Sequence, residues 1–274
     1  MPPRSALDLP TLREATRRAA LEAGAIAAAF FRAGAPTSAR IWSKAGGSPV
    51  TEADIAADDH LKAACAKTMP EAAWLSEETA DDPARLHSEL VWVVDPIDGT
   101  RAFMSGSRDW CVCVALMRGG RPVLGVVHAP ALEATYEAVL GAGATLNGAP
   151  ICASGAASLE GARIAGPKPM LDAFARHAPI APQPKVPSLA LRLARIAEGL
   201  LDGGLISPDS RDWDLVAASL ILEEAGGKLT LTDGRPLVFN AERPMHPTLL
   251  ASNGALHPAL VKAAAAARAR FSSR

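Results

Sequence analysis

The sequence predicts an α+β or layered α/β fold, and three features of the 274-residue chain support this class. Helical stretches come first, a run of strands follows, and helices and strands mix in the last third. The strands of the middle region follow one another directly, so repeated βαβ units are not expected. Hydrophobic residues make up 49% of the chain, which is enough to build a sizeable core.

Two helices are expected at the N-terminal side. The first is predicted by an alanine-rich stretch over residues 8–31 that Gly34 closes. The second is expected to open at Thr51 and to end before Pro70, since threonine caps helices well and proline interrupts them. A polar loop, SKAGGSP, separates the two helices.

The middle of the chain reads as strands. Residues 72–75 and 90–94 are short apolar runs that both stop at acidic residues, so their carboxyl ends are expected at one sheet edge. Residues 110–117 and 122–128 flank the pair Gly119-Gly120, a pattern typical of a hairpin. Residues 135–140 and the segment GAGATLNG extend this antiparallel region.

The second half has its own pattern. Residues 188–200 predict an amphipathic helix, residues 205–207 a short strand, and residues 212–225 a helix that ends at Gly226-Gly227. Strands are expected over 228–231 and 248–252, and a helical tail from residue 256. The proline-rich stretch 179–184 suggests a linker, which predicts an N-terminal domain over 1–178 and a C-terminal domain over 179–274.

Charge and cysteine content exclude several classes of protein. The 28 basic and 29 acidic residues nearly cancel, so neither a nucleic acid nor a membrane surface is an expected partner. The start MPPRSALDLP lacks an apolar leader core and no apolar run could span a membrane, which predicts a cytoplasmic protein. Cys111 and Cys113, two apart in a predicted strand, share a face, and the other cysteines are Cys65 and Cys152. All four are expected to be reduced, partly buried thiols, and neither a zinc site nor a disulfide is expected.

The segment VWVVDPIDGT at residues 91–100 combines a buried strand with two acidic residues. Its apolar run, without alternation, is typical of a strand that is covered on both faces. Asp95 and Asp98 follow, and Pro96 between them is expected to end the strand ladder. A carboxylate at the end of a buried strand is costly unless a cation neutralises it, so these residues predict a cation site.

Further acidic residues fall at the ends of predicted elements, where they can converge on one cleft. Glu77 ends one strand, Asp214 lies in the first turn of a late helix, and Asp54 lies at the junction GSPVTEAD. Magnesium binds a few carboxylates, keeps several waters, and completes its coordination with substrate phosphate. The acidic set therefore predicts a magnesium centre.

Each residue alone has a structural interpretation. Asp214 could stabilise a helix N-terminus, Asp98 before Gly99 could be a turn residue, Asp54 could belong to a capping box with Thr51, and Glu77-Glu78 could be a solvated pair. The combination favours a functional site, because DPIDGT after a buried strand uses Pro, Gly and paired Asp in an order that a turn does not require.

Four motifs in order resemble those of the inositol monophosphatase superfamily: PVTEAD at 49–54, LSEE at 75–78, DPIDGT at 95–100 and WDLVAASLILEEAGG at 213–227. GAGATLNGAPI resembles the hairpin of that family, so the resemblance covers nearly the whole chain. It implies a five-layered α-β-α-β-α sandwich of the inositol monophosphatase and fructose-1,6-bisphosphatase type. It also implies a magnesium-dependent, lithium-sensitive phosphatase that forms a homodimer and acts on a small phosphorylated metabolite.

The resemblance also implies roles for particular residues. Two or three Mg²⁺ ions per subunit would be held by Glu77, Asp95, the carbonyl of Ile97, Asp98 and Asp214, with Asp95 bridging two of them. Asp54 and Thr100 would hold and deprotonate the attacking water, with Glu77 counted among the catalytic residues. The N–H groups of Gly99 and Thr100 would face the phosphate, Lys44 would lie near the metals, and Asp214 would also face the substrate.

The substrate is read by other residues. The triplet Arg101-Ala102-Phe103 favours a 3'(2'),5'-bisphosphate nucleotidase of the CysQ type through its arginine. Ser207 stands where inositol phosphatases of this superfamily place a glutamate, although Asp209 or Asp212 could substitute for it. An inositol-1-monophosphatase and a histidinol-phosphate phosphatase, some of which carry a similar R-A-F, stay as alternatives.

A second phosphate would need a cation. Lys168 in AGPKPM is the preferred candidate, and the others are Lys185, Arg192 and Arg211. A non-catalytic homologue that binds an anion or a partner protein is the alternative from another class, but the complete acidic set favours catalysis. A dinucleotide-binding oxidoreductase is rejected, because GAGATLNG is followed by strand-like residues with no helix to receive a pyrophosphate.

Overall fold

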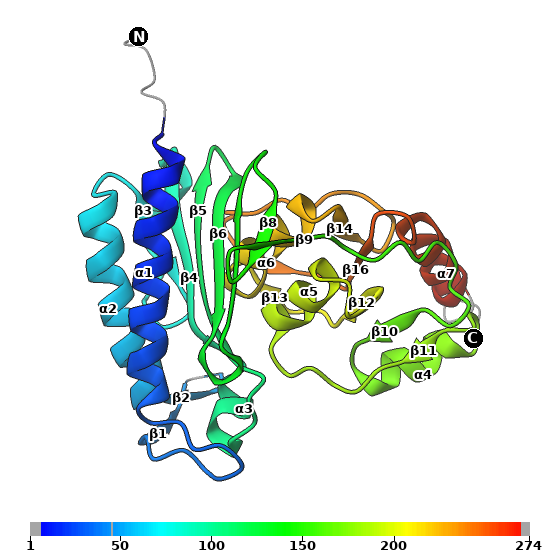
Figure 1. Ribbon diagram of the computed structural model, residues 1–274, viewed down its shortest axis with the longest axis horizontal. Coiled ribbons are helices and arrows are strands. Elements are labelled where there is room, and N and C mark those ends of the chain that lie inside the picture. The colour runs from blue at the N-terminus through cyan, green and yellow to red at the C-terminus, as the bar shows by residue number, and fades with distance from the viewer. Residues whose placement is uncertain (1–6, 45, 270–274) are drawn as a thin grey trace.

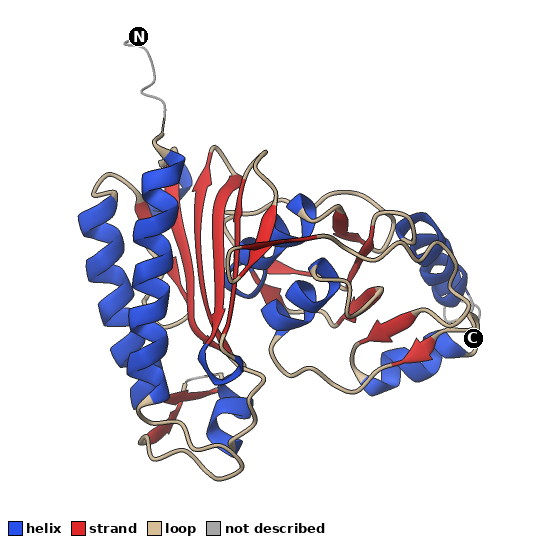
Figure 2. Cartoon of the chain, in the orientation of Figure 1, coloured by secondary structure: helices blue, strands red, loops and turns tan. Residues whose placement is uncertain are grey.

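The computed structural model describes residues 7–44 and 46–269 and arranges them in five layers (Figures 1 and 2). The first layer contains helices α1 (Leu9–Ala28) and α2 (Glu52–Thr68), the third contains α5 (Leu189–Ala197) and α6 (Asp212–Glu224), and the fifth contains α4 (Lys168–Ala175) and α7 (His257–Ala269). A β-sheet forms each of the second and fourth layers. The α-β-α-β-α sandwich expected from the sequence is therefore confirmed.

The first sheet has seven strands in the spatial order β3-β4-β5-β6-β7-β8-β9. Strands β3 and β4 are parallel, and every other neighbouring pair is antiparallel. The strands are β3 (Ala73–Ser76), β4 (Leu90–Asp98), β5 (Cys111–Arg118), β6 (Arg121–Ala129), β7 (Ala134–Val139), β8 (Ala144–Leu146) and β9 (Ala149–Ile151).

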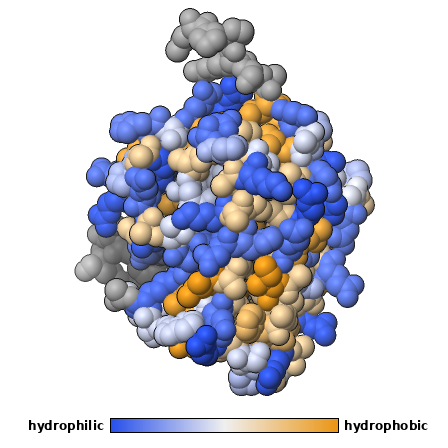
Figure 3. Space-filling model, turned by 90° about the vertical axis from the view of Figure 1, so that its left-hand side faces the viewer, coloured by the Kyte–Doolittle hydropathy of each residue, from blue (hydrophilic) through white to orange (hydrophobic). Residues whose placement is uncertain are grey.

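Helices α1 and α2 cover the outer face of this sheet, and a side chain caps the N-terminus of each. Asp8 accepts the backbone N–H of Thr11, and Thr51 caps α2. Their small and apolar side chains, such as Leu12 and Leu61, pack on the strands in one hydrophobic cluster. The opposite side of these helices faces solvent and is mainly hydrophilic, with small hydrophobic patches (Figure 3).

Helix α6 lies between the two sheets and is apolar over most of its surface. Its buried residues include Leu215, Val216 and Leu220, which belong to the largest hydrophobic cluster of the described residues. Gly125 on β6 permits the close approach of this helix, because a Cβ there would lie 2.7 Å from the carbonyl oxygen of Ala217. The helix that carries Asp214 is thus fixed against the sheet that carries the other acidic residues.

The second sheet has five strands in the order β11-β10-β12-β16-β14. They are β11 (Ala181–Pro182), β10 (Arg163–Ala165), β12 (Gly203–Ile206), β16 (Leu249–Asn253) and β14 (Gly227–Leu231). Strand β10 precedes the boundary expected between residues 178 and 179, yet it pairs with β12. The proline-rich stretch 179–184 also contributes β11 to this sheet. The chain therefore enters the second sheet at β10, before the boundary that the sequence predicted.

Some smaller elements differ from those that the sequence predicted. Strand β4 does not end at residue 94 but continues to Asp98, with a shift of register on the way, because an irregularity lets the ladder pass Pro96. Elements that the pattern did not predict include the hairpin β1 (Ile41–Ser43) and β2 (Pro49–Thr51), the pair β13 (Ser210–Arg211) and β15 (Met245–His246), and short 3₁₀ helices at Pro83–His87 and Pro130–Leu132. These are two- to five-residue segments, too short for a periodic signal.

Parts of three expectations lie outside the described residues: the start of the chain through residue 6, Ala45 in the polar loop, and the tail beyond residue 269. Among the helices of the described residues, none is long and apolar enough to cross a membrane.

Candidate metal centre

Strand β4 presents Asp95 and Asp98 on the same face of the sheet. Side chains three apart on a regular strand point to opposite faces. Here Asp95 pairs with Cys113 and Asp98 with Cys111, so two residues on β4 oppose one on β5. This β-bulge restores the common orientation, and it explains why a D-x-x-D spacing can build one site.

Glu77 joins Asp95 from the neighbouring strand. Strands β3 and β4 are parallel, Ser76 pairs with Val94, and the N–H of Glu77 donates to the Val94 carbonyl at 3.3 Å. The carboxyl ends of parallel strands share one edge, so the residue after each strand lies beside the other, as the sequence led us to expect.

Asp214 reaches the same place from the third residue of α6. Its Oδ2 accepts the backbone N–H of Arg211 at 2.8 Å, which fixes the carboxylate at the start of the helix. One carboxylate oxygen each of Glu77, Asp95 and Asp214 lie within 4.8 Å of one another. Three carboxylates from three elements therefore converge on a volume that one or more cations would fill.

Electrostatics supports a cation at this position. Burial raises the pKa of Asp95 well above its ordinary value, and the neighbouring charges of Glu77 and Asp98 raise it further. Burial and the charge of Asp98 likewise raise the pKa of Asp214. These carboxylates are unfavourable as anions when no cation is present, and a divalent ion reverses that balance.

The donor set fits magnesium. Every acidic group at this centre offers carboxylate oxygen, and the carbonyl oxygen of buried Ile97 lies beside them, 3.1 Å from the hydroxyl oxygen of Thr100. Hard oxygen ligands of this kind suit Mg²⁺ rather than a soft metal. Of the ligands that the sequence suggested, Glu77, Asp95 and Asp214 lie together, and Asp98 is near enough for its charge to raise the pKa of Asp95 and Asp214.

Asp98 is held more tightly than the sequence indicated. Its Oδ2 accepts the Ser188 hydroxyl at 2.5 Å and the Ala190 N–H at 2.6 Å, so it lies at the N-terminus of α5. Burial still raises its pKa, although these hydrogen bonds favour the charged form. Sequence reasoning missed Ser188 because its only local signal is that of a helix N-cap, a role it also has toward the Leu191 N–H.

Asp54 and Thr100 form the expected pair. Thr100 begins α3 (Thr100–Ser105), and its hydroxyl lies 3.3 Å from Asp54 Oδ1 and 3.1 Å from the Ile97 carbonyl. Asp54 Oδ2 accepts both the N–H and the hydroxyl of Thr51, so the capping box and the contact with Thr100 coexist. Burial raises the pKa of Asp54 to about 6. Gly99 is the N-cap of α3 with φ 96°, a left-handed conformation that favours glycine.

Lys44 lies at the edge of the acidic set. Its Nζ is 2.8 Å from Glu77 Oε1 and 2.8 Å from Glu78 Oε1. Burial lowers the pKa of Lys44, but the two carboxylates outweigh this and raise it overall. Glu78, which the sequence left as half of a solvated pair, is buried at its side chain, and burial raises its pKa to about 7.

The basic residues proposed for a second phosphate are dispersed. Lys168 is exposed on α4 and pairs with Asp172, and Figure 1 places this helix far from α3. Lys185 is exposed, whereas Arg192 is buried and donates to the carbonyls of Val186 and Leu205. Arg211 lies over the ring of Trp213, next to Asp214.

Asp212 is not free to contact a ring hydroxyl in place of Ser207. It is fully buried, accepts the Asn240 N–H at 2.6 Å and lies 2.6 Å from His246 Nε2. Asp209 is exposed in a left-handed turn with φ 73°. The contact between Asp212 and His246 therefore fixes the start of α6, and no sequence pattern revealed it.

Comparisons with known proteins agree with this geometry. Residues 8–269 match the model of the "Inositol monophosphatase family". Over 230 residues the chain is 31% identical to the histidinol-phosphatase of Mycobacterium tuberculosis, covering 80% of this chain and 85% of that protein. It is 29% identical over 222 residues to the 3'(2'),5'-bisphosphate nucleotidase CysQ of Aggregatibacter actinomycetemcomitans, covering 74% and 79%.

The fold is also similar to that of a solved structure. The structure of an inositol monophosphatase from Anabaena (Nostoc) sp. PCC 7120 superimposes with a TM-score of 0.78 at 26% identity, over 94% of this chain and 96% of that one. These similar proteins are named for three different substrates, so the comparisons define the class of reaction more narrowly than the substrate.

Proposed function

Because this chain belongs to the inositol monophosphatase family, whose members are metal-dependent phosphatases, we propose that it hydrolyses 3'-phosphoadenosine 5'-phosphate to AMP and phosphate, with Mg²⁺ as its metal. The chain is a phosphoric monoester hydrolase. The single observation that carries the proposal is the convergence of Glu77, Asp95 and Asp214 beside the Asp54–Thr100 pair. The choice of a nucleotide rests on Arg101 and on Ser207 in place of a glutamate.

The proposed ligands of two or three Mg²⁺ ions are the carboxylates of Glu77, Asp95, Asp98 and Asp214 and the carbonyl of Ile97. When bound, Mg²⁺ supplies positive charge that neutralises the phosphoryl oxygens and makes a water easier to deprotonate. The fixed positions of the carboxylates avoid reorganisation during the reaction, because the bulge and the N-termini of α5 and α6 already hold them.

The Asp54–Thr100 pair takes the proton of the attacking water. Thr100 has one hydroxyl proton and two acceptors within reach, Asp54 Oδ1 and the Ile97 carbonyl. With its proton donated to Asp54, the Thr100 oxygen accepts a hydrogen bond from water and orients it. As the water oxygen bonds to phosphorus, the ester bond breaks, one water proton passes through Thr100 to Asp54, and the leaving oxygen takes a proton from solvent.

The remaining assignments extend this proposal. The N–H groups of Gly99 and Thr100 would contact the phosphate, Lys44 would approach it from beside Glu77, and Asp214 would border the substrate. Lys168 is the proposed contact for the second phosphate. This role requires that α4 approaches the substrate and that the Lys168 Nζ leaves its ion pair with Asp172.

The test is phosphate release from 3'-phosphoadenosine 5'-phosphate, inositol 1-phosphate and histidinol phosphate, each with and without magnesium. We expect the bisphosphate to give the highest kcat/KM, and Asp95→Asn serves as the blank. A preference for either monophosphate overturns the substrate and leaves the metal chemistry in place. If none of the three substrates releases phosphate while magnesium still binds, the result supports the non-catalytic alternative.

Lithium provides an independent test of the all-oxygen metal centre. A small monovalent ion suits the same oxygen ligands but neutralises less of their charge, so we expect phosphate release to fall in millimolar lithium. Turnover that is undiminished by lithium, measured beside an equal concentration of sodium, would contradict the proposal.

We also propose that the protein is a cytoplasmic homodimer. The dimer is supported by the resemblance to the family, and light scattering in solution should give twice the chain mass of 28.4 kDa. The compartment is supported by the four cysteines, which are all free thiols. Fractionation of the producing cells, with a membrane marker and a secreted marker as controls, tests the location.

A further inference from the structure

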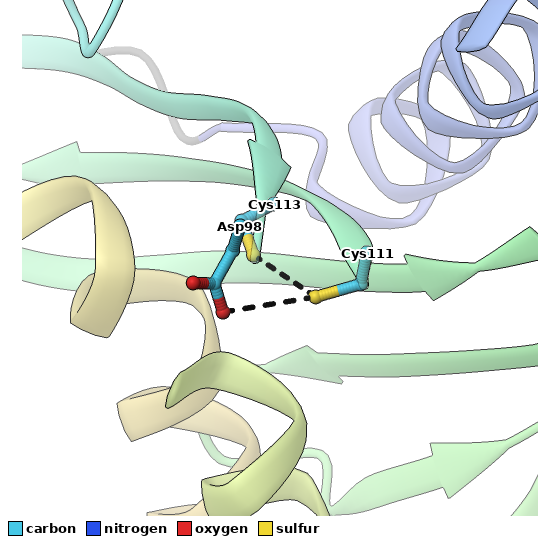
Figure 4. Close-up of side chains that lie close together, drawn as sticks. All are labelled: Asp98, Cys111 and Cys113. Atoms are coloured by element: carbon cyan, nitrogen blue, oxygen red, sulfur yellow. Dashed lines mark hydrogen bonds between the residues drawn. The ribbon is translucent and has the colours of Figure 1, made fainter. Parts of the chain in front are cut away.

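Two thiols lie directly behind the metal centre. Cys111 and Cys113 are on β5, opposite Asp98 and Asp95, and both side chains are fully buried. Figure 4 shows the sulfur of Cys111 joined by dashed lines to the Cys113 sulfur, at 3.7 Å, and to Asp98 Oδ2, at 4.0 Å. The Ser188 hydroxyl oxygen lies 3.3 Å from the same sulfur. The two sulfur atoms of this cluster have no part in the proposed hydrolysis.

The spacing of these atoms fits a tetrahedral metal. Zinc–sulfur bonds are about 2.3 Å long, so two sulfurs on a tetrahedral zinc are about 3.8 Å apart. The two cysteine sulfurs are already 3.7 Å apart, and the ligand atoms of Asp98, Cys111 and Cys113 all lie within 4.8 Å of one another. A bound ion would need only small movements of these side chains, with the Ser188 oxygen available as a fourth ligand.

We propose that Cys111, Cys113 and Asp98 form a second metal site, specific for thiophilic divalent cations such as Zn²⁺ and Cd²⁺, and that its occupation inhibits the enzyme. Thiolate ligands select soft metals, whereas the oxygen ligands of the neighbouring centre select magnesium. Asp98 belongs to both sites. A cation held by the two sulfurs therefore withdraws Asp98 from the magnesium centre, and this inhibitory consequence rests on the proposed function.

The exposure of Asp98 indicates how a cation would reach the two buried thiols. Asp98 is the member of the three with some exposed surface, at 7%, so an ion would enter from the magnesium side. Each thiol gives up its proton to solvent as its bond to the metal forms. Because both sites need Asp98, each cation should weaken the binding of the other by the same factor.

Cadmium absorbance provides a readout that needs no substrate. The whole protein would be titrated with Cd²⁺ under reducing, magnesium-free conditions while the ultraviolet charge-transfer band of cadmium thiolate is followed. We expect one equivalent to bind with the amplitude of two thiolates, and excess magnesium to raise the apparent Kd. Cys111→Ser and Cys113→Ser should each lose about half of the band and bind at least about tenfold more weakly.

Two other thiols give matched controls. Cys65→Ser removes an equally buried sulfur, and Cys152→Ser removes an exposed one, and neither should change the band. Cys113→Ala is a second variant in case the serine is poorly tolerated, and circular dichroism checks the fold of each protein. The proposal is overturned by a wild type without the band, by a band of undiminished amplitude in both site variants, or by loss of the band in either control. Failure of the substrate assays with the band intact would instead count against the proposed function alone.

Discussion

At the scale of single residues, Asp95 combines a position that is unfavourable for a carboxylate with the role of a metal ligand in the proposed chemistry. It is 1% exposed, and its pKa is raised by burial and by the charges of Glu77, Asp98 and Asp214. The sequence predicted Asp95 as a ligand from its place at the end of an apolar strand. The amount of negative charge around Asp95 depends on the residue that follows β3, on α6 and on the bulge in β4 itself, so it follows only from the tertiary structure.

Asp95→Asn should therefore separate stability from activity. Without metal, the neutral amide relieves burial and repulsion, so we expect the free energy of unfolding to rise by about 1 kcal/mol or more. With magnesium, the variant should lose most of the metal-induced stabilisation and more than about 100-fold in kcat/KM. Urea unfolding with and without magnesium measures the first effect. A variant that is less stable than the wild type in the absence of metal would contradict this account.

At the scale of elements, the bulge in β4 and the N-terminus of α5 together position Asp98. The bulge turns Asp98 to the same face as Asp95, and α5 then binds its carboxylate through Ser188 and the Ala190 N–H. The sequence contained the Pro96 that marks the irregularity, but it was interpreted as the end of the strand. Pairing with β5 decides between these two possibilities, and pairing is a long-range property.

Ser188→Ala tests whether the cap of α5 also positions the metal ligand. Loss of the cap should lower the free energy of unfolding by about 1 kcal/mol, and loss of the bond to Asp98 should weaken magnesium binding about tenfold or more. Calorimetric titration with magnesium measures the second effect. The matched control is Asp8→Ala, which removes the cap of α1 far from the site and should leave magnesium affinity unchanged. Equal affinities in the two variants would show that Ser188 acts only as a cap.

At the scale of the whole molecule, the layers hold the site together, because Asp214 reaches the other acidic residues only when α6 is seated on the first sheet. Gly125 allows that seating, since a Cβ would lie 2.7 Å from the carbonyl oxygen of Ala217. Gly125→Ala should lower the free energy of unfolding by about 1–3 kcal/mol and raise the KM for magnesium. Gly155→Ala is the control, because a Cβ there meets nothing within 4 Å. Indistinguishable urea midpoints for the two variants would rule out this role of Gly125.

The buried histidine at the start of α7, which contacts the second sheet, predicts a dependence of stability on pH. His257 lies 2.8 Å from both the Ser252 and Thr230 hydroxyls, and burial, helped by Lys228, lowers its pKa from 6.5 to about 4. Between these two pH values the unfolded chain binds the proton more strongly. This contribution to stability is therefore complete above about pH 6.5 and is lost as the pH falls toward 4.

His257→Gln isolates this contribution from that of the acidic residues. In the presence of magnesium, the stability difference between wild type and variant should shrink as the pH is lowered from 7 to about 4.5. Urea unfolding across this range measures it, and a difference that stays constant would show that His257 does not titrate on unfolding.

The sequence by itself determined the order of most helices and strands, the carboxylates of the proposed metal centre and the class of reaction, because these depend on local periodicity and on short motifs. Only the tertiary structure decided the bulge that aligns Asp95 with Asp98, the binding of Asp98 by Ser188, and the burial of Asp212 against His246. It also placed Lys44 beside Glu77 and Lys168 on a distant helix. The physical reason is range: local pattern fixes the conformation of a segment, whereas register, burial and the meeting of charges depend on partners far away in the chain.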